Sequence, residues 1–363
     1  MTLRVIIYRL GVIPLLLLLC ILAACSQQDL DLEEQGMVSL KVLASPGTKA
    51  GEGGTATATL PAKETAIFDL SIFIFNSNGD VIGFTSQDFS DGKPTAVVVK
   101  TRKATGCSVY AIANAKTLNN GESPFDGVST LSVFKTKYLS FTDAKAPNDD
   151  KCLLMMGVSS NFDTSSASSA SPAIITLKRL ASRIDYTIAV NNDQTTGFPI
   201  VVDSYQLCNV PTSTLYQQSD FTSPSMPSFT TFADFDKVPT SISSGAAATS
   251  PTSAGPYYVY ANADPDPDPD YSKGTYLVIQ AHSEVQGAGG TKYTVWKSNF
   301  KVEMPGKQVL PNYHYKIDIV INGSVEGKNG GVITKYEAYP YFSGSIPTLN
   351  PWQSETDRNL DLQ

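Results

Sequence analysis

The sequence has 363 residues with 27 basic and 34 acidic side chains, which gives a formal net charge of −7. It carries no basic stripe that could neutralise phosphates, so the charge pattern argues against a nucleic-acid partner. The length predicts about two domains, and the hydrophobic fraction of 42% is sufficient for two cores.

The first 24 residues are predicted to be a lipoprotein signal peptide. Arg4 and Arg9 precede an apolar run that ends in Leu-Ala-Ala-Cys25, a lipobox in which the thiol of Cys25 receives diacylglycerol before cleavage. A membrane-spanning helix is the alternative, but the run is short against the roughly 20 residues that a bilayer needs. Cleavage would remove two arginines and no acid, which changes the net charge from −7 to −9. Residues 25–36 are polar and acidic and are expected to form an unpacked tether.

Alternation of apolar and polar residues with period two dominates the rest of the chain and is typical of half-buried strands. The first predicted strand covers residues 37–45 and places Val38, Leu40 and Val42 on one face. Glycines and a proline then interrupt the pattern, which predicts a flexible loop directly after this strand.

A hairpin is predicted next, from strands over residues 68–75 and 81–85 joined by Asn78-Gly79, which adopts a tight turn at little cost. Two later strands, residues 184–190 and 313–321, each show one clearly apolar face. Further strands are predicted over residues 97–101, 107–113, 153–158, 174–180, 275–281, 293–296 and 299–304.

One helix is predicted, over residues 129–141, with Ser129 as its cap and Leu131, Phe134 and Tyr138 along one side. We expect this apolar stripe to pack on a sheet. Many short strands with few helices indicate an all-β fold of antiparallel β-sandwiches.

The domain organisation follows from these strands. We expect an N-terminal β-sandwich domain over residues 37–180 and a C-terminal β-sandwich domain over residues 181–363, arranged in series. The stretch 211–256 is rich in Ser, Thr and Pro and is predicted to form long surface loops.

The sequence offers little material for catalysis. His282 and His314 each lack a second histidine at ligand spacing, and no nucleotide, zinc or nucleophile motif is present. The alternating Asp-Pro run at residues 264–270 could suggest calcium, but proline keeps the backbone extended and the carboxylates apart, so a stiff loop is favoured. We therefore expect no metal, no cofactor and no enzymatic activity, although paired carboxylates of a glycosidase would be invisible in a sequence.

Two other residue groups have competing interpretations. Tyr257, Tyr258 and Tyr260 could form an exposed platform for sugars, but tyrosines in a sandwich more often lie between core and solvent. Three cysteines remain in the mature chain and lie in apolar settings, so burial as small hydrophobic residues is favoured over a disulfide framework. These are Cys107, Cys152 and Cys208.

Several segments, in this order along the chain, together resemble the fimbrillin family of Bacteroidales, the subunits of type V pili. The individual motifs are structural and weakly specific, so the resemblance depends on their collinear order over nearly the whole mature chain. They are the lipobox, Ile72–Asn76 with Asn78-Gly79, Tyr110–Ala115, Met156-Gly157, Leu177–Asp185, Tyr205–Pro211 and Tyr313–Ile319.

The resemblance implies two transthyretin-like domains and assembly by strand exchange. In the family, a lipidated precursor reaches the outer membrane, a trypsin-like surface protease cuts the loop after the first strand, and a C-terminal strand of another subunit fills the vacated groove. In this chain, residues 37–49 would be the removable strand and cleavage loop, and Lys49-Ala50 the scissile bond. The family more often has arginine at this position.

The donor strand has two candidates in the C-terminal tail. One contains Val332, Ile333 and Tyr336, and the other contains Trp352, which resembles an aromatic residue near the family's C-terminus. Either segment could instead be the last strand of its own domain.

The resemblance implies a structural subunit of a cell-surface fimbrium that acts in adhesion. Its partners would be other fimbrial subunits, the outer membrane through the lipid anchor, the processing protease, and a receptor on a host or bacterial surface. The alternative is a surface glycan-binding lipoprotein of a nutrient-uptake system, which would use Tyr257 and Tyr258.

Overall fold

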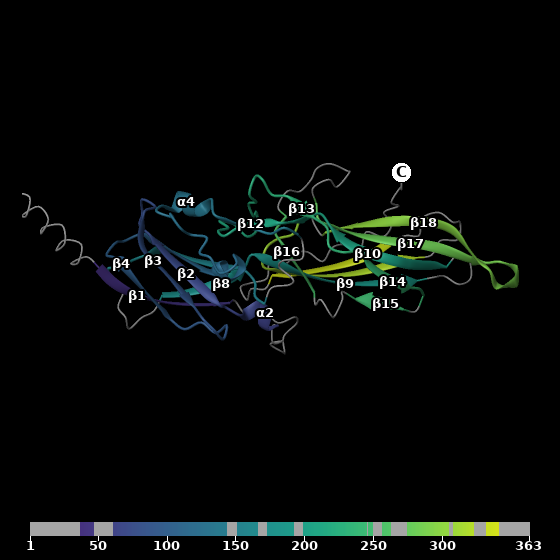
Figure 1. Ribbon diagram of the computed structural model, residues 1–363, viewed down its shortest axis with the longest axis horizontal. Helices are drawn as coiled ribbons and strands as arrows, with labels where there is room; N and C mark the ends of the chain where they lie inside the picture. Colours follow the sequence, from purple (N-terminus) through teal and green to yellow (C-terminus); the bar gives the residue numbers. More distant parts are fainter. Residues whose placement is uncertain are drawn as a thin grey trace, which may run out of the picture.

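The computed structural model describes residues 37–46, 61–143, 151–165, 173–191, 199–244, 246–249, 256–262, 274–304, 308–322 and 332–340. The described part is elongated, with a barrel at one end and two further sheets at the other (Figure 1). The expectation of an all-β fold is confirmed. None of the helices in these ranges is long and apolar enough to cross a membrane.

The N-terminal part forms a closed barrel with the strand order β1-β4-β3-β2-β5-β7-β8. Its central strand, β2, is buried at every position because its two faces contribute to two different cores. Leu70 and Ile74 belong to the barrel interior, whereas Phe73 and Phe75 pack outward. The strands are β1 (Met37–Pro46), β2 (Asp69–Phe75), β3 (Val81–Asp88), β4 (Val97–Arg102), β5 (Cys107–Ala113), β7 (Met155–Phe162) and β8 (Ala173–Arg179).

The predicted hairpin is confirmed between β2 and β3. These strands pair antiparallel, and Gly79 adopts a φ of +87°, a conformation that glycine reaches without a steric penalty. The Asn76 side chain accepts hydrogen bonds from the backbone amides of Asn78 and Asp80 and so closes the turn.

The predicted helix over residues 129–141 is much shorter in the structure. Helix α4 covers only Leu131–Lys135, and the Thr130 side chain, not Ser129, caps it by accepting a hydrogen bond from the amide of Val133. The chain then forms strand β6 (Tyr138–Ser140), which pairs with β12 (Ser213–Leu215). Pairing with this distant strand overrides the local helical pattern. Two other short helices, α2 (Ala62–Thr65) and α3 (Ala115–Leu118), precede α4.

The C-terminal part contains two sheets packed face to face, with the orders β14-β10-β17-β18 and β15-β9-β19-β20, and β16 pairs with β9. The apolar faces predicted for residues 184–190 and 313–321 are buried between them. The strands are β9 (Ala181–Asn191), β10 (Ile200–Cys208), β14 (Val238–Ile242), β15 (Ala247–Thr249), β16 (Tyr257–Tyr260), β17 (Tyr276–Gln286), β18 (Lys292–Glu303), β19 (Tyr313–Asn322) and β20 (Val332–Pro340).

Three details of the C-terminal part differ from the expectation. The two strands predicted over residues 293–304 are one continuous strand, β18, which forms a long hairpin with β17. The pairing is not purely antiparallel, because β9 and β19 run parallel. The stretch 211–256 contains short strands as well as loops, including β12, β14 and β15; β11 (Val210–Pro211) and β13 (Phe232–Ala233) pair at its start.

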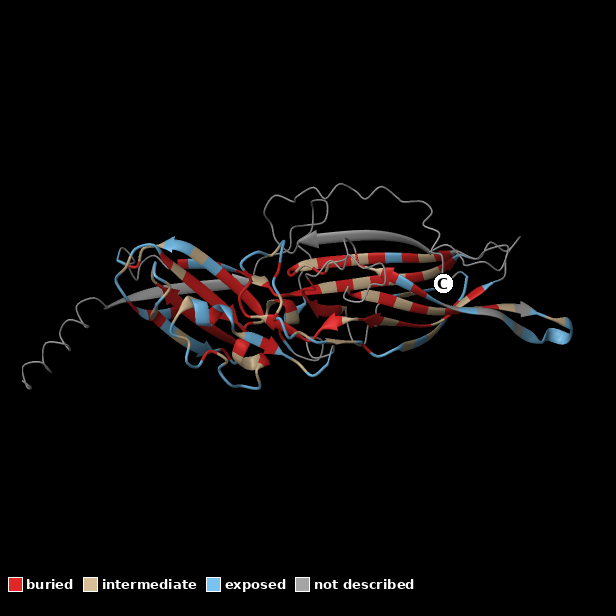
Figure 2. Ribbon diagram, turned by 90° about the horizontal axis from the view of Figure 1, so that it is seen from above, coloured by how far each residue is buried: buried red, intermediate tan, exposed pale blue. Residues whose placement is uncertain are grey.

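A third core lies at the junction between the barrel and the C-terminal sheets. It combines Phe75 and Phe134 from the N-terminal part with Tyr216, Tyr258 and Tyr260 from the C-terminal part. Figure 2 shows buried residues along both halves of the molecule and through this junction, while the end of the β17–β18 hairpin projects from the far end and is exposed. β8 belongs to the barrel and β9 to a C-terminal sheet, so the chain passes from one part to the other near the predicted domain boundary. The β6–β12 pair joins strands from opposite sides of this boundary.

Candidate functional site

The strand that closes the barrel, β1, is the candidate functional element. Its first half, from Met37 to Val42, pairs antiparallel with β4. Its second half, from Val42 to Pro46, pairs parallel with β8. Val42 is the one position in both registers. Each barrel edge is therefore held by only half of β1.

The register of β1 agrees with the face predicted from the sequence. The positions of Val38, Leu40 and Val42 are paired with Thr101, Val99 and Val97, each of which is buried. The intervening positions are paired with exposed residues of β4. The alternation read in the sequence of β1 therefore coincides with an alternation of buried and exposed positions on its neighbour.

The two strands beside β1 carry part of the barrel core. Val97 and Val99 on β4, and Ile175 and Leu177 on β8, are almost completely buried. Without β1, these strands would become two free edges beside an apolar slot. A slot of this kind accepts an extended segment that restores the hydrogen-bond ladder and the burial together.

Four predicted site residues lie outside the described residues: Cys25 of the lipobox, Lys49 and Ala50 of the scissile bond, and Trp352 of one donor candidate. Their predicted roles stay predictions.

The other donor candidate forms β20, an edge strand in the described part of the C-terminal sheets. Its pairing partner is β19, in an antiparallel register that matches Val332 to Ile321, Ile333 to Val320 and Tyr336 to Ile317. This pairing is the arrangement expected of the chain's own last strand. An edge strand has neighbours on one side, so it can leave a sheet more easily than a central strand.

The tyrosines considered for a sugar platform are core residues. Tyr257, Tyr258 and Tyr260 are at most 5% exposed. Tyr257 stacks on Tyr186, whose hydroxyl donates a hydrogen bond to that of Tyr257. The interpretation of these tyrosines as an exposed binding surface is wrong, and their structural interpretation is confirmed.

Both histidine side chains contact carboxylates. His282 lies between Asp203 at 2.7 Å and Glu284 at 3.0 Å, in a polar hollow on the outer face of β10, β17 and β18. Hydrogen bonds from Lys292 and then His282 lower the pKa of Glu284. His314 contacts Asp185. Among the described residues, no group of His, Cys, Asp and Glu side chains has the arrangement of a metal site.

The three cysteines are buried, as expected. Burial, followed by the nearby charge of Asp234, raises the pKa of the Cys208 thiol to about 12. A thiol in this state is a poor nucleophile.

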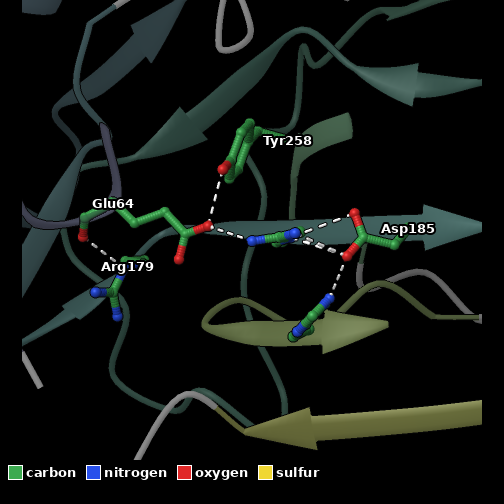
Figure 3. Close-up of polar contacts among 6 residues, drawn as sticks. Glu64, Arg179, Asp185 and Tyr258 are labelled. Atoms are coloured by element: carbon green, nitrogen blue, oxygen red, sulfur yellow. Dashed lines mark hydrogen bonds and ion pairs between the residues drawn. The ribbon is translucent and has the colours of Figure 1, made fainter. Parts of the chain in front are cut away.

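One polar cluster at the junction was not anticipated from the sequence (Figure 3). The completely buried Glu64 of α2 accepts hydrogen bonds through one carboxylate oxygen from Arg183 of β9 at 3.1 Å and from Tyr258 of β16 at 2.8 Å. Arg183 also binds Asp185 at 2.9 Å, and Asp185 contacts His314 of β19 at 2.6 Å. The cluster therefore connects a helix of the N-terminal part to three strands of the C-terminal part.

The cluster changes the pKa of two of its members, Asp185 and Tyr258. Burial raises the pKa of Asp185, but hydrogen bonds from His314 and Arg183 outweigh this effect and hold it below the ordinary value. Burial, followed by the negative charge of Glu64, raises the pKa of Tyr258. Arg183 and Asp185 are part of a motif quoted for the family resemblance, but nothing in the sequence pairs them with Glu64.

The sequence of this chain is similar to that of a known protein family over part of its length. Residues 37–197 match the family model described as "Major fimbrial subunit protein (FimA)". Among curated protein sequences, none matches the chain.

Solved structures show the same fold over most of the chain. The fimbrilin FimA from Porphyromonas gingivalis W83 is 14% identical, with a TM-score of 0.52 over 84% of this chain and 97% of that one. A Bacteroides eggerthii protein assigned provisionally to cell adhesion is 16% identical, with a TM-score of 0.56 over 84% and 96% of the two chains. The tip fimbrial protein Mfa3 from P. gingivalis, truncated at its C-terminus, is 13% identical, with a TM-score of 0.51 over 84% and 99%.

The chain is therefore similar to fimbrial subunits in sequence over residues 37–197 and in fold over most of its length. The predicted resemblance to the fimbrillin family is confirmed over residues 37–197, a range that includes the whole of β1.

Proposed function

We propose that this chain is a structural subunit of a type V pilus, exported as a lipoprotein precursor, activated by proteolysis after β1 and polymerised by strand exchange for adhesion. The observation that carries the proposal is the two-sided pairing of β1. This strand alone joins β4 to β8 in the described barrel, so its departure opens one slot and leaves the remaining strand pairs in place.

The proposed order of events follows from the position of β1 at the start of the described part of the chain. Before cleavage, residues 47–60 tether β1 to α2, so β1 can leave its slot but remains close to it. Closure of such a short loop has a small entropic cost, which favours return of β1. After a cut at Lys49-Ala50, β1 is no longer joined to the rest of the barrel, and a strand from another subunit can compete for the slot.

The sequence of β20 favours it over the Trp352 segment as the donor. Aligned on their terminal prolines, Pro46 of β1 and Pro340 of β20, the two strands share an Ala, a Lys and a Val located two, five and eight residues earlier. In both strands the positions of the shared Val and Ala are paired with buried residues of the neighbouring strands. β20 therefore presents a pattern that suits the slot of β1.

Limited trypsin digestion tests the proposal. We expect one early cut in residues 47–60, release of β1, and ladders of high-mass species on a denaturing gel without boiling. Lys49→Gln is the control and should remain monomeric under the same digestion. A wild-type chain that is cut after Lys49 and still remains a stable monomer would refute assembly by strand exchange.

The donor strand and the anchor have separate tests. Val332 of β20 aligns with Val38, which pairs with Thr101. Cysteines at Val332 of one copy and Thr101 of another should therefore form crosslinks in the polymer if β20 is the donor, whereas crosslinks from the Trp352 segment would identify that segment. Metabolic labelling with palmitate should label the wild type and not Cys25→Ala.

A further inference from the structure

Helix α2 lies where the proposed cleavage loop enters the fold. Residues 47–60 join β1 directly to this helix. α2 has only four residues, and no side chain caps its first turn. A helix of this length is not stable alone, so its position depends on the contacts made by its side chains.

The principal contact of α2 is with the C-terminal part. The Glu64 carboxylate is bound by Arg183 and Tyr258, and Lys63 lies 5.1 Å from the centre of the Tyr258 ring. The backbone carbonyl of Glu64 accepts a hydrogen bond from Nε of Arg179 at 2.8 Å. Figure 3 shows the hydrogen bonds of Glu64 with Arg179 and Tyr258. Together, these contacts hold α2 between the end of β8 and the start of β9 and β16.

The residues after α2 are fixed to the barrel. The Asn114 side chain donates a hydrogen bond to the carbonyl of Ala66 at 2.9 Å and accepts one from the amide of Phe68 at 2.8 Å. The amide of Ile67 donates to the carbonyl of Gly92. β2, the strand shared by two cores, begins immediately afterwards, at Asp69.

We propose that α2 is a latch: the pairing of Glu64 with Arg183 and Tyr258 holds the newly cut end of the chain on the C-terminal sheets while β1 leaves. The proposal rests on the proposed cleavage after β1. Without the latch, withdrawal of β1 and fraying of the new terminus would reach β2, which lies only a few residues beyond α2. With it, the opening stops before residue 61 and the slot keeps its shape for the donor.

Lys63 provides a direct readout, because trypsin can cleave the Lys63-Glu64 bond only when α2 leaves its site. The purified full chain is digested with limiting trypsin, and mass spectrometry follows the first cut in residues 47–60 and the second cut after Lys63. Arg183→Gln removes the ion pair, and Tyr258→Phe removes only a hydroxyl and preserves the core. Lys292→Gln, which breaks the exposed ion pair with Glu284 on the β17–β18 hairpin, is the matched control.

We expect the second cut to be slow in the wild type and in Lys292→Gln, at least tenfold faster in Arg183→Gln, and intermediate in Tyr258→Phe. Hydrogen exchange of residues 66–70 should rise in both latch variants after the first cut and change much less before it. Equal rates of the second cut in the wild type and in Tyr258→Phe and Arg183→Gln would overturn the latch and leave the proposed assembly intact. Absence of the first cut in the wild type would overturn both.

Discussion

The slot of β1 and the junction between the two halves are held together in different ways. The barrel is closed by one strand through backbone pairing, each edge by half of that strand. The junction is closed mainly by side chains from both halves, through a shared aromatic core and the ion pair between the buried Glu64 and Arg183, with the short β6–β12 strand pair beside them. A backbone ladder accepts any suitable extended segment, whereas a packed core accepts only its own side chains. We therefore expect the pairing of β1 to be an exchangeable contact and the junction to be a permanent contact.

The largest expected effect comes from breaking the permanent contact. Tyr216 comes from the C-terminal part, is completely buried and packs on Phe125 of the barrel half. Tyr216→Ala should lower the free energy of unfolding by about 3–5 kcal/mol, as for other buried aromatic residues, and should destabilise both halves. Denaturant unfolding measures the loss. Tyr216→Phe is the control and should be neutral or slightly stabilising, because this hydroxyl has no hydrogen-bond partner among the described residues.

A proline in β1 should break the exchangeable contact alone. Val42→Pro removes the amide at the one position that belongs to both registers. We expect the lost ladder hydrogen bond to lower the free energy of unfolding by about 1–3 kcal/mol, an effect confined to the barrel. Hydrogen exchange should show faster exchange in β4 and β8 and unchanged protection in β9 and β19. Met37→Pro, at the first residue of the strand, should have a much smaller effect. Equal loss of protection in both halves would contradict the comparison.

The slot of β1 should also be weakened by a change in β7, the other neighbour of β8. A Cβ atom added to Gly157 of β7 would meet the carbonyl oxygen of Thr176 at 2.5 Å and Cγ2 of Ile175 at 2.6 Å, both on β8. Gly157→Ala should therefore push β8 away and lower the free energy of unfolding by about 1–3 kcal/mol. Trypsin-cut Gly157→Ala should also hold its donor strand less tightly, measured by the temperature at which the ladders dissociate. Ser160→Ala, exposed on the same strand, should behave as the wild type.

The smallest expected effect is the pH-dependent contribution of Asp185, in the polar cluster at the junction, to the free energy of unfolding. The pKa of Asp185 is lowered in the fold from its ordinary value of 3.8, so its ionised form stabilises the protein above that value and this contribution is lost as the pH falls below it. Asp185→Asn should be less stable than the wild type by about 1 kcal/mol at pH 7. The difference should shrink as the pH falls further below about 4. A difference that stays constant in urea unfolding over this range would show that the charge of Asp185 is not involved.

Features encoded in local patterns could be predicted from the sequence. The period-two alternation located β1, β9 and β19, and Asn78-Gly79 identified the first hairpin, because strand faces and tight turns depend on neighbouring residues. The helix at 129–141 was overestimated because Tyr138–Ser140 pairs with Ser213–Leu215, a contact with no local signal. Glu64 was missed for the same reason, since its partner Arg183 lies far along the chain.

β1 is bound along its length by an antiparallel ladder to β4 and a parallel ladder to β8, and this arrangement has a mechanical consequence. Any strand seated in this slot is bound along one half to β4 and along the other half to β8. Tension along the strand axis therefore loads every backbone hydrogen bond of both ladders in shear, so that many must break together. Force perpendicular to the strand would instead open the bonds one after another. A filament joined through this slot should resist stretching along its length far better than peeling at a joint.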